Sequence, residues 1–269
     1  MAKKREIPLT LNLCDIGSQL SRFGKIGLLQ QKYEPSDYLA GSYFCENYFL
    51  NETKNLIYEL VQTGKKFKCV LPIPSQNNLD DFRVNVYEII KEYKEYISAF
   101  VVNDIGSLDK ISEVTDNIIL GRLFHRSIRD PRYPETVTGR KFSPDIEVLR
   151  LVDKYNISGI ELENIYDDVT CPELSCDIHM HQNYCYLSCT RSCYYASISQ
   201  PAEHKFRPDN PCDLSCEKNI HRIKLQTGQE VFMLGKGLCF KVTPGTLTGE
   251  DRLKSVIITP VDELLGDRS

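Results

Sequence analysis

The sequence predicts an α/β fold of the TIM-like (β/α) barrel type, complete or incomplete, with a Cys-rich C-terminal extension and a β-hairpin. Short apolar or alternating runs recur with helical segments between them. The first four runs begin about 30 residues apart, which is the length of one βα unit. The chain has 269 residues, a length at which single-domain α/β barrels are common.

Seven short runs are predicted as strands. They are Ile7 to Leu13, Asp37 to Gly41, Phe67 to Pro72, Tyr96 to Val102, Asn117 to Gly121, Gly159 to Glu163 and Asp177 to His181. Strands that alternate with helices pair in parallel, so six or seven units favour a barrel over an open doubly wound sheet. A Gly-rich phosphate loop of the doubly wound type is absent from the sequence.

Amphipathic windows between these runs predict helices, because their apolar residues repeat at the helical period. Three windows are clearest: Leu56, Ile57, Leu60 and Val61; Phe82, Val86, Ile89, Ile90 and Tyr93; and Val148, Leu149, Val152 and Tyr155. The third follows a Ser143-Pro144 pair, which is a helix-start signal.

The composition divides the chain into three parts. Residues 1–170 are expected to form the barrel core, and residues 246–269 a C-terminal tail. Residues 171–245 are expected to form a Cys-rich, cluster-binding segment packed on the barrel, since eight of the eleven cysteines lie there. Near its end, "GQEVFMLGKGLCFKV" holds two β-like runs around a Gly-Lys-Gly turn, which predicts the hairpin.

Charge and cysteine content narrow the function classes. A net charge of −4 does not indicate a nucleic-acid surface. The N-terminus lacks an apolar signal core, and no run approaches the roughly 18 apolar residues of a membrane span, so a cytoplasmic location is expected. Eleven cysteines, an odd number, fit metal or cluster ligation better than disulfides in a reducing compartment.

The cysteine spacing favours an iron–sulfur cluster, with zinc or no metal as alternatives. Cys14 and Cys69 lie inside predicted strands and are expected to be buried free thiols. If residues 185–193 form a helix, its end thiols lie roughly 12 Å apart, so one cluster could not take Cys185, Cys189 and Cys193 together. The paired C-x2-C spacing of zinc sites is absent, and scattered thiols suit a cluster.

Several segments resemble the peptidase U32 family. "DIHMHQNYCYLSCTRSC" is similar to its signature of an acidic residue, a histidine and two cysteines, but Cys185 and Cys193 are eight positions apart rather than seven. The chain is closest to the iron–sulfur accessory proteins of oxygen-independent ubiquinone hydroxylation. The similar segments are "SDYLAGSYFC", "RSCYYAS", "CDLSCEK", "LQTGQEVFMLGKG", "VVNDIGSL" and "GRLFHRSIRDPR".

The resemblance implies a [4Fe–4S] cluster on Cys45, Cys193, Cys212 and Cys216 over a barrel-like fold. A sister branch implies Cys185, Cys193, Cys212 and Cys239 instead, which makes Cys185 and Cys239 the reserve ligands. Cys171, Cys176 and Cys189 have no counterpart in the resemblance. They are interpreted either as ligands of a second metal or as thiols packed near the first.

Three functions follow from the resemblance. The first is an enzyme or enzyme subunit in oxygen-independent hydroxylation, or a related modification, of a small molecule or RNA base. The second is a non-catalytic iron–sulfur partner subunit in a heteromer with a member of the same family. The third is a U32-type peptidase, for which Cys185 beside His181 would be the nucleophile and base.

Polar residues at predicted strand ends mark a candidate active site, because parallel barrels place chemistry at the carboxyl ends of their strands. They are Asn103, Asp104, Arg122, His125, Glu161, Glu163, His179 and His181. We expect Arg122 to bind an anionic group, and Glu161 and His181 to complete the catalytic set. The alternatives are that Arg122 pairs with the glutamates, that Asn103 and Asp104 cap a helix, and that the histidines are structural.

Overall fold

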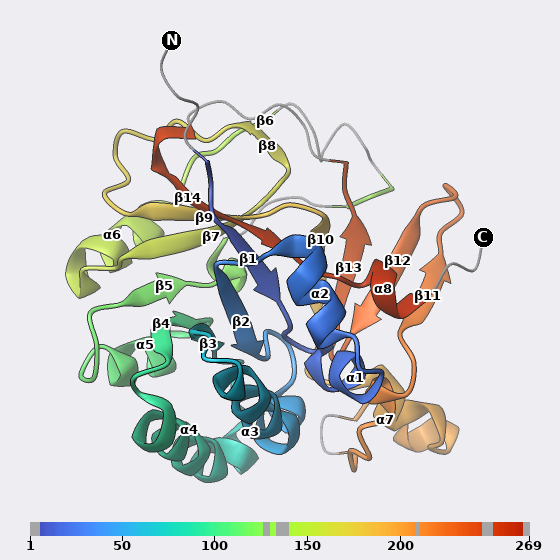
Figure 1. Cartoon of the computed structure of the whole chain (residues 1–269). Helices are drawn as coiled ribbons and strands as arrows, with labels where there is room; N and C mark the ends of the chain where they lie inside the picture. Colours follow the sequence, from blue (N-terminus) through green and yellow to red (C-terminus); the bar gives the residue numbers. More distant parts are fainter. Residues whose placement is uncertain (1–5, 126–129, 133–139, 208–209, 244–249, 266–269) are drawn as a thin grey trace.

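The computed structural model describes residues 6–125, 130–132, 140–207, 210–243 and 250–265 (Figure 1). Its centre is a closed barrel of parallel strands in the order β1-β14-β9-β7-β5-β4-β3-β2. The strands are β1 (Leu9–Asn12), β2 (Asp37–Gly41), β3 (Phe67–Val70), β4 (Ile97–Val102), β5 (Ile118–Leu120), β7 (Gly159–Glu163), β9 (Asp177–His181) and β14 (Leu253–Ile258). The fold is therefore a TIM-like (β/α) barrel.

Helices cover the outside of the barrel (Figure 1). They are α1 (Gly17–Arg22), α2 (Ile26–Tyr33), α3 (Glu46–Gln62), α4 (Leu79–Tyr93), α5 (Ile105–Ile111) and α6 (Ile146–Tyr155), with α7 (Tyr194–Ile198) and α8 (Asp262–Leu265) near the C-terminal end. Short 3-10 turns are η1 (Gln76–Asn78), η2 (Arg122–Phe124), η4 (Ala202–His204), η5 (Ser215–Glu217) and η6 (Glu250–Arg252). Within the described ranges, none of these helices has the length and apolar character needed to cross a membrane.

The seven predicted strands and the three predicted helical windows are all confirmed, but the predicted barrel boundary at residue 170 is wrong. Strands β9 and β14 lie beyond it, and β14 falls in the segment predicted as a tail. The alternation in β14 is hard to recognise because Ser255 is one of its buried residues. Ser255 hydrogen-bonds His179, its register partner on the neighbouring strand β9. A polar side chain therefore stands where the strand pattern would place an apolar one.

A second sheet packs beside the barrel, on the right of Figure 1. It is antiparallel, in the order β10-β13-β12-β11, formed by β10 (Tyr184–Cys189), β11 (His221–Lys224), β12 (Glu230–Leu234) and β13 (Gly237–Lys241). The predicted hairpin is confirmed as β12 and β13. The sheet lies in the connection from β9 to β14, and the short β6 (Arg140–Lys141) and β8 (Tyr166–Asp168) pair separately.

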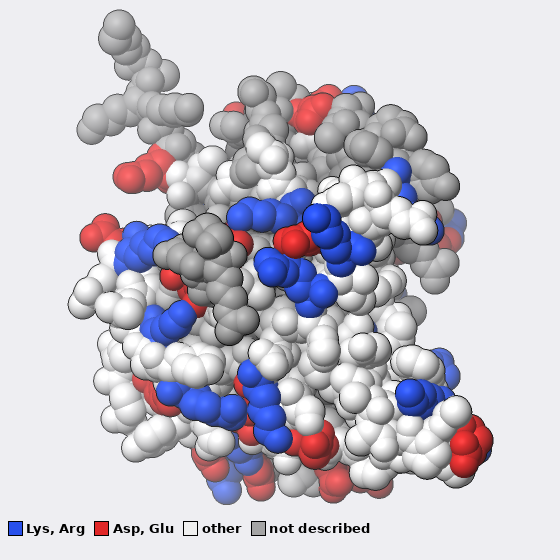
Figure 2. Space-filling model, turned by 90° about the vertical axis from the view of Figure 1, so that its right-hand side faces the viewer, with Lys and Arg blue, Asp and Glu red and all other residues white. Residues whose placement is uncertain are grey.

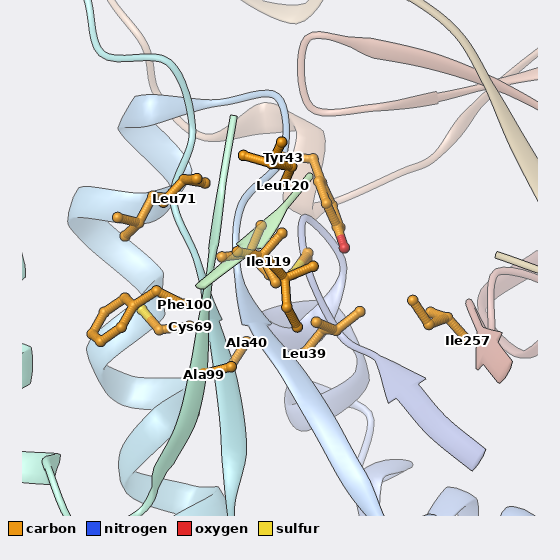
Figure 3. Packing of buried hydrophobic residues seen from close by; sticks show 14 of the residues in the cluster. Leu39, Ala40, Tyr43, Cys69, Leu71, Ala99, Phe100, Ile119, Leu120 and Ile257 are labelled. Atoms are coloured by element: carbon orange, nitrogen blue, oxygen red, sulfur yellow. The ribbon is translucent and has the colours of Figure 1, made fainter. Parts of the chain in front are cut away.

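The core between the barrel and its helices is apolar. Ala40, Cys69 and Phe100 are register partners on β2, β3 and β4, and Figure 3 shows Cys69 and Phe100 side by side. Cys69 is fully buried and Cys14 is 1% exposed, as the sequence predicts for structural thiols. The carboxyl end of the barrel differs in character, because buried charged side chains gather there.

Candidate cysteine centre and barrel mouth

The turn after β2 places Cys45 at the carboxyl end of the barrel. Cys45 is the N-cap residue of α3, and its N–H donates to Ser42 Oγ at 2.8 Å. The Ser42 hydroxyl in turn donates to Asp15, which also accepts the Tyr43 N–H at 2.9 Å. A buried carboxylate after β1 therefore fixes the backbone that carries Cys45.

Two thiols of the first predicted ligand set share a cluster, and the other two influence one of them electrostatically. Cys193 and Cys216 belong to one small apolar cluster, and Gln19 of α1 holds the Cys216 carbonyl at 2.7 Å. Burial raises the pKa of Cys216, and the charges of Cys45, Cys193 and Cys212 raise it further. Electrostatic coupling weakens with distance, so these influences indicate that the four thiols lie near one another.

The four thiols are soft donors, of the kind that ligate iron–sulfur clusters. Within the described ranges, no group of three or more His, Cys, Asp or Glu side chains is arranged to hold one metal ion. A single ion requires thiolates at about 2.3 Å from its centre. A [4Fe–4S] cluster needs a wider cage, because each of its four thiolates binds a different iron atom. Four soft thiols suit that chemistry.

The two reserve ligands lie on opposite faces of the antiparallel sheet. Cys185 on β10 is the register partner of Phe240, whereas Cys239 on β13 is the partner of Tyr186. Directly paired residues share a face and neighbouring residues alternate, so Cys185 and Cys239 point in opposite directions. The second predicted ligand set therefore cannot converge on one cluster without rearrangement of this sheet.

The remaining thiols lie in two places. Cys176 immediately precedes β9, so it lies at the amino end of the barrel. Burial raises the pKa of Cys176, and nearby Cys171 raises that pKa further. The interpretation that these two thiols pack near the first site is therefore wrong. Cys189, in contrast, fits the interpretation of a thiol packed near the first site. Burial raises the pKa of both Cys189 and Cys45, and for both thiols Lys236 lowers the pKa and Asp15 raises it.

Arg122 and Glu163 form a buried ion pair at the carboxyl ends of β5 and β7. Arg122 Nε and Nη2 each lie 2.7 Å from a different oxygen of Glu163, and Nη2 also donates to the Tyr184 carbonyl at 3.0 Å. The two side chains are only 2% and 3% exposed. The guanidinium N–H groups of Arg122, which were expected to bind an anionic substrate, therefore donate to Glu163. This is the alternative in which Arg122 pairs with a glutamate.

Glu161 and His181 form a second buried pair beside the first. His181 Nε2 lies 3.3 Å from Glu161 Oε2, and the Tyr43 hydroxyl donates to Glu161 Oε1 at 2.6 Å. Burial acts to raise the pKa of Glu161, but His181, Tyr43 and Arg122 outweigh it and hold that pKa below its ordinary value. Among the described residues, His181 Nδ1 has no hydrogen-bond partner, so this pair keeps one nitrogen for a further group.

The other predicted mouth residues have structural contacts. Asp104 caps α5 by accepting the Ser107 N–H at 2.9 Å, and Asn103 donates to the Leu71 carbonyl at 2.9 Å. His125 packs edge-on against Phe142 at 5.7 Å between ring centroids. His179 lies deeper in the barrel, and burial lowers its pKa to about 3, so it is neutral at pH 7.

The peptidase arrangement lacks support in the geometry. Cys185 packs with Ile165, Val231 and Phe240 in a separate apolar cluster. His181 Nε2 faces Glu161, and in the described part of the chain its Nδ1 is bonded to no thiol. An activated cysteine needs a base within hydrogen-bond reach.

Three residues of this region were not recognised from the sequence: Asp15, Tyr43 and Lys236. Asp15 follows a predicted strand, so the strand-end rule applied to the other acids would have included it. Tyr43 lies two residues before Cys45 and its ring also lies under Arg122, 5.3 Å from the guanidinium carbon. Lys236 was recognised only as the centre of a turn.

The thiols and the two buried ion pairs share the carboxyl end of the barrel, and the antiparallel sheet packs over it. No protein-family model, curated protein or solved structure matches the chain.

Proposed function

We propose that this protein binds a [4Fe–4S] cluster through Cys45, Cys193, Cys212 and Cys216. The grouping of these four thiols at the barrel mouth, from segments far apart in the sequence, is the observation that supports it. Cys45 and Cys193 are both N-cap residues, and the 17-residue helix α3 directs its positive end at Cys45. That field favours thiolate over thiol.

The activity we propose is that of a U32-type enzyme or enzyme subunit in oxygen-independent hydroxylation, or a related modification, of a small molecule or RNA base, in the cytoplasm. A bound cluster with four thiolate ligands would supply electron transfer at the mouth. The Glu161 and His181 pair, ordered by Tyr43, provides a buried proton donor and acceptor near it.

A second candidate is a non-catalytic iron–sulfur partner subunit, in a heteromer with another member of the same family. The engaged guanidinium of Arg122 favours this candidate, because a substrate anion would have to displace Glu163 from it. In that case the buried pairs stabilise the barrel, and the partner supplies the substrate site.

The first experiment is anaerobic purification with iron and sulfide analysis. The wild-type chain should contain about four iron atoms and show a brown cluster absorbance. Single Cys→Ala variants at positions 45, 193, 212 and 216 should lose most of the iron, whereas Cys171→Ala and Cys176→Ala serve as matched controls at the other end of the barrel. Iron retained in all four ligand variants would exclude this site.

A second experiment separates the two candidates. Tyr43→Phe, Glu161→Gln and His181→Gln are to be assayed for modification with the cluster loaded and the partner present. Loss of turnover with iron retained supports an enzyme, whereas full turnover in all three variants supports the accessory role.

A further inference from the structure

The turn between β12 and β13 brings a cation into the cysteine centre. Its two residues are Gly235 and Lys236, and β13 begins directly after them at Gly237; both glycines are required by the close approach. Gly235 has a φ of +56°, and a Cβ there would lie 3.2 Å from Asp15 Oδ1 and from Cys45 Cβ. The hairpin tip therefore packs directly on the turn that carries Cys45.

The second glycine packs against an aromatic ring. A Cβ at Gly237 would lie 2.4 Å from ring atoms of Phe44, a distance that real side chains do not reach. The tip is also tied to the other thiol-bearing segment, because the Lys236 carbonyl accepts the Thr190 N–H at 3.1 Å. Lys236 is thus held between the segments of Cys45 and Cys193.

The Lys236 side chain is buried beside thiols with an incomplete counter-charge. It is 11% exposed, and its Nζ lies 3.6 Å from Glu46 Oε1. The residue before it, Gly235, lies against the Cys45 turn, where a Cβ would come within 3.2 Å of the Cys45 Cβ. Burying an ammonium group is costly unless anions surround it. One carboxylate at 3.6 Å is weak compensation, whereas an anionic thiolate-ligated cluster would complete it.

Other cations of this sheet behave differently. Figure 2 shows Lys and Arg side chains exposed on the face at the right of Figure 1, with acidic side chains beside several of them. On β11 and β13, Arg222 lies 3.6 Å from Glu230 and Lys241 lies 2.9 Å from Asp262, and all four side chains are at least 39% exposed. Salt and water screen such pairs, so they have little influence on a buried centre.

We infer that Lys236 is a positioning residue that sets the reduction potential of the centre by placing a fixed positive charge beside Cys45. This inference rests on the proposed function, because it concerns the cluster that the four thiols would bind. A buried cation stabilises the more negative, reduced state of a cluster and so raises its potential. The hairpin is then a device that delivers charge as well as a structural support.

The test is a redox titration of the purified, cluster-loaded protein with dithionite, followed by electron paramagnetic resonance. Lys236→Met keeps the length of the side chain and removes its charge, so the midpoint potential should shift to lower values. Lys236→Arg should restore the wild-type potential, and Lys241→Met is the surface control that should leave it unchanged.

Glu46→Gln distinguishes charge from packing. It breaks the same ion pair but leaves the ammonium group, so it should shift the potential in the direction opposite to Lys236→Met. A merely structural ion pair would make the two variants alike, and that result, or an unchanged potential in Lys236→Met, overturns the inference.

Loading of the cluster is measured separately for each protein. If Lys236→Met binds no cluster, the test rests on Lys236→Arg, which should bind the cluster and keep the wild-type midpoint potential. A Lys236→Arg protein without cluster, or with a shifted potential, counts against the role of charge. If the wild-type chain binds no iron, the proposed function fails instead.

Discussion

Single side chains at the barrel mouth carry charges that the surrounding protein has to compensate. Arg122 and Glu163 are matched bidentately and almost completely buried, which is the geometry in which removal of one partner is most costly. Whether such a residue serves catalysis or stability can be resolved by unfolding experiments as well as by activity.

Arg122→Ala should reduce the free energy of unfolding by about 3–5 kcal/mol, because it leaves the Glu163 carboxylate buried without its partner. Replacing both residues together, with Met at 122 and Leu at 163, should recover most of that loss. Urea unfolding followed by circular dichroism measures both effects. Arg150→Ala is the control, since its pair with Glu147 is more than 65% exposed and should contribute less than about 1 kcal/mol. Equal losses in Arg122→Ala and Arg150→Ala would contradict the expectation.

His179 should make the protein less stable in acid. Its Nδ1 lies 2.7 Å from Ser255 Oγ, and burial lowers its pKa from 6.5 to about 3. Between these values the unfolded chain binds a proton that the native chain excludes. The free energy of unfolding therefore falls as the pH falls through this window, by up to about 1.4 kcal/mol per pH unit.

The measurement is urea unfolding at a series of pH values for the wild type, His179→Gln and the exposed control His204→Gln. Only His179→Gln should lose this slope, and the difference between variants isolates it from Asp15, whose raised pKa acts in the opposite direction. Nuclear magnetic resonance of the imidazole gives an independent answer, because a His179 ring that protonates near pH 6.5 would disprove the assignment.

At the scale of elements, the hairpin of β12 and β13 depends on glycine for its docking. Gly237→Ala should destabilise the protein by about 1–3 kcal/mol, because its methyl group overlaps the Phe44 ring. Thermal unfolding checks this, and adding Phe44→Leu should recover part of the loss. Gly27→Ala in α2 is the matched control: its Cβ would meet nothing within 4 Å, so alanine should stabilise by about 0.5–1 kcal/mol. Similar effects of the two alanines would rule out close packing as the cause.

Most strands of the barrel could be predicted, because β1 to β5 are short apolar or alternating runs and a helix follows each of them before the next barrel strand. β14 could not be predicted, because its buried Ser255 is hydrogen-bonded to His179 on another strand, and such a pairing has no signal in the local sequence. The region 185–193 was considered as a helix, but it begins as β10, whose partner β13 lies about 50 residues further along. Non-local pairing of this kind overrides local propensity.

The candidate site was predictable in part. The strand-end rule found Arg122, Glu161, Glu163 and His181, and the structure joins them as two ion pairs. The grouping of Cys45 with Cys193, Cys212 and Cys216 came from a family resemblance, since spacing alone could not choose among eleven thiols. Neither the strand-end rule nor the resemblance could indicate Lys236, because its role depends on the packing of the hairpin tip against the turn that carries Cys45.

At the scale of the whole molecule, the first and last strands of the barrel are neighbours. β1 pairs with β14, and the sheet that carries Lys236 lies in the chain before β14. The wall of the barrel therefore has two open parallel edges until the final strand arrives.

This closure has a consequence for synthesis of the chain on the ribosome. At about 5–20 residues per second, Cys193 emerges roughly 7 to 30 seconds after Cys45, and β14 emerges later still. During that interval Cys45 is an uncapped thiol on a half-built barrel, accessible to oxidants and stray metals. The Cys45 thiol is therefore most accessible to oxidants before β14 completes the barrel, at a stage that precedes the native fold.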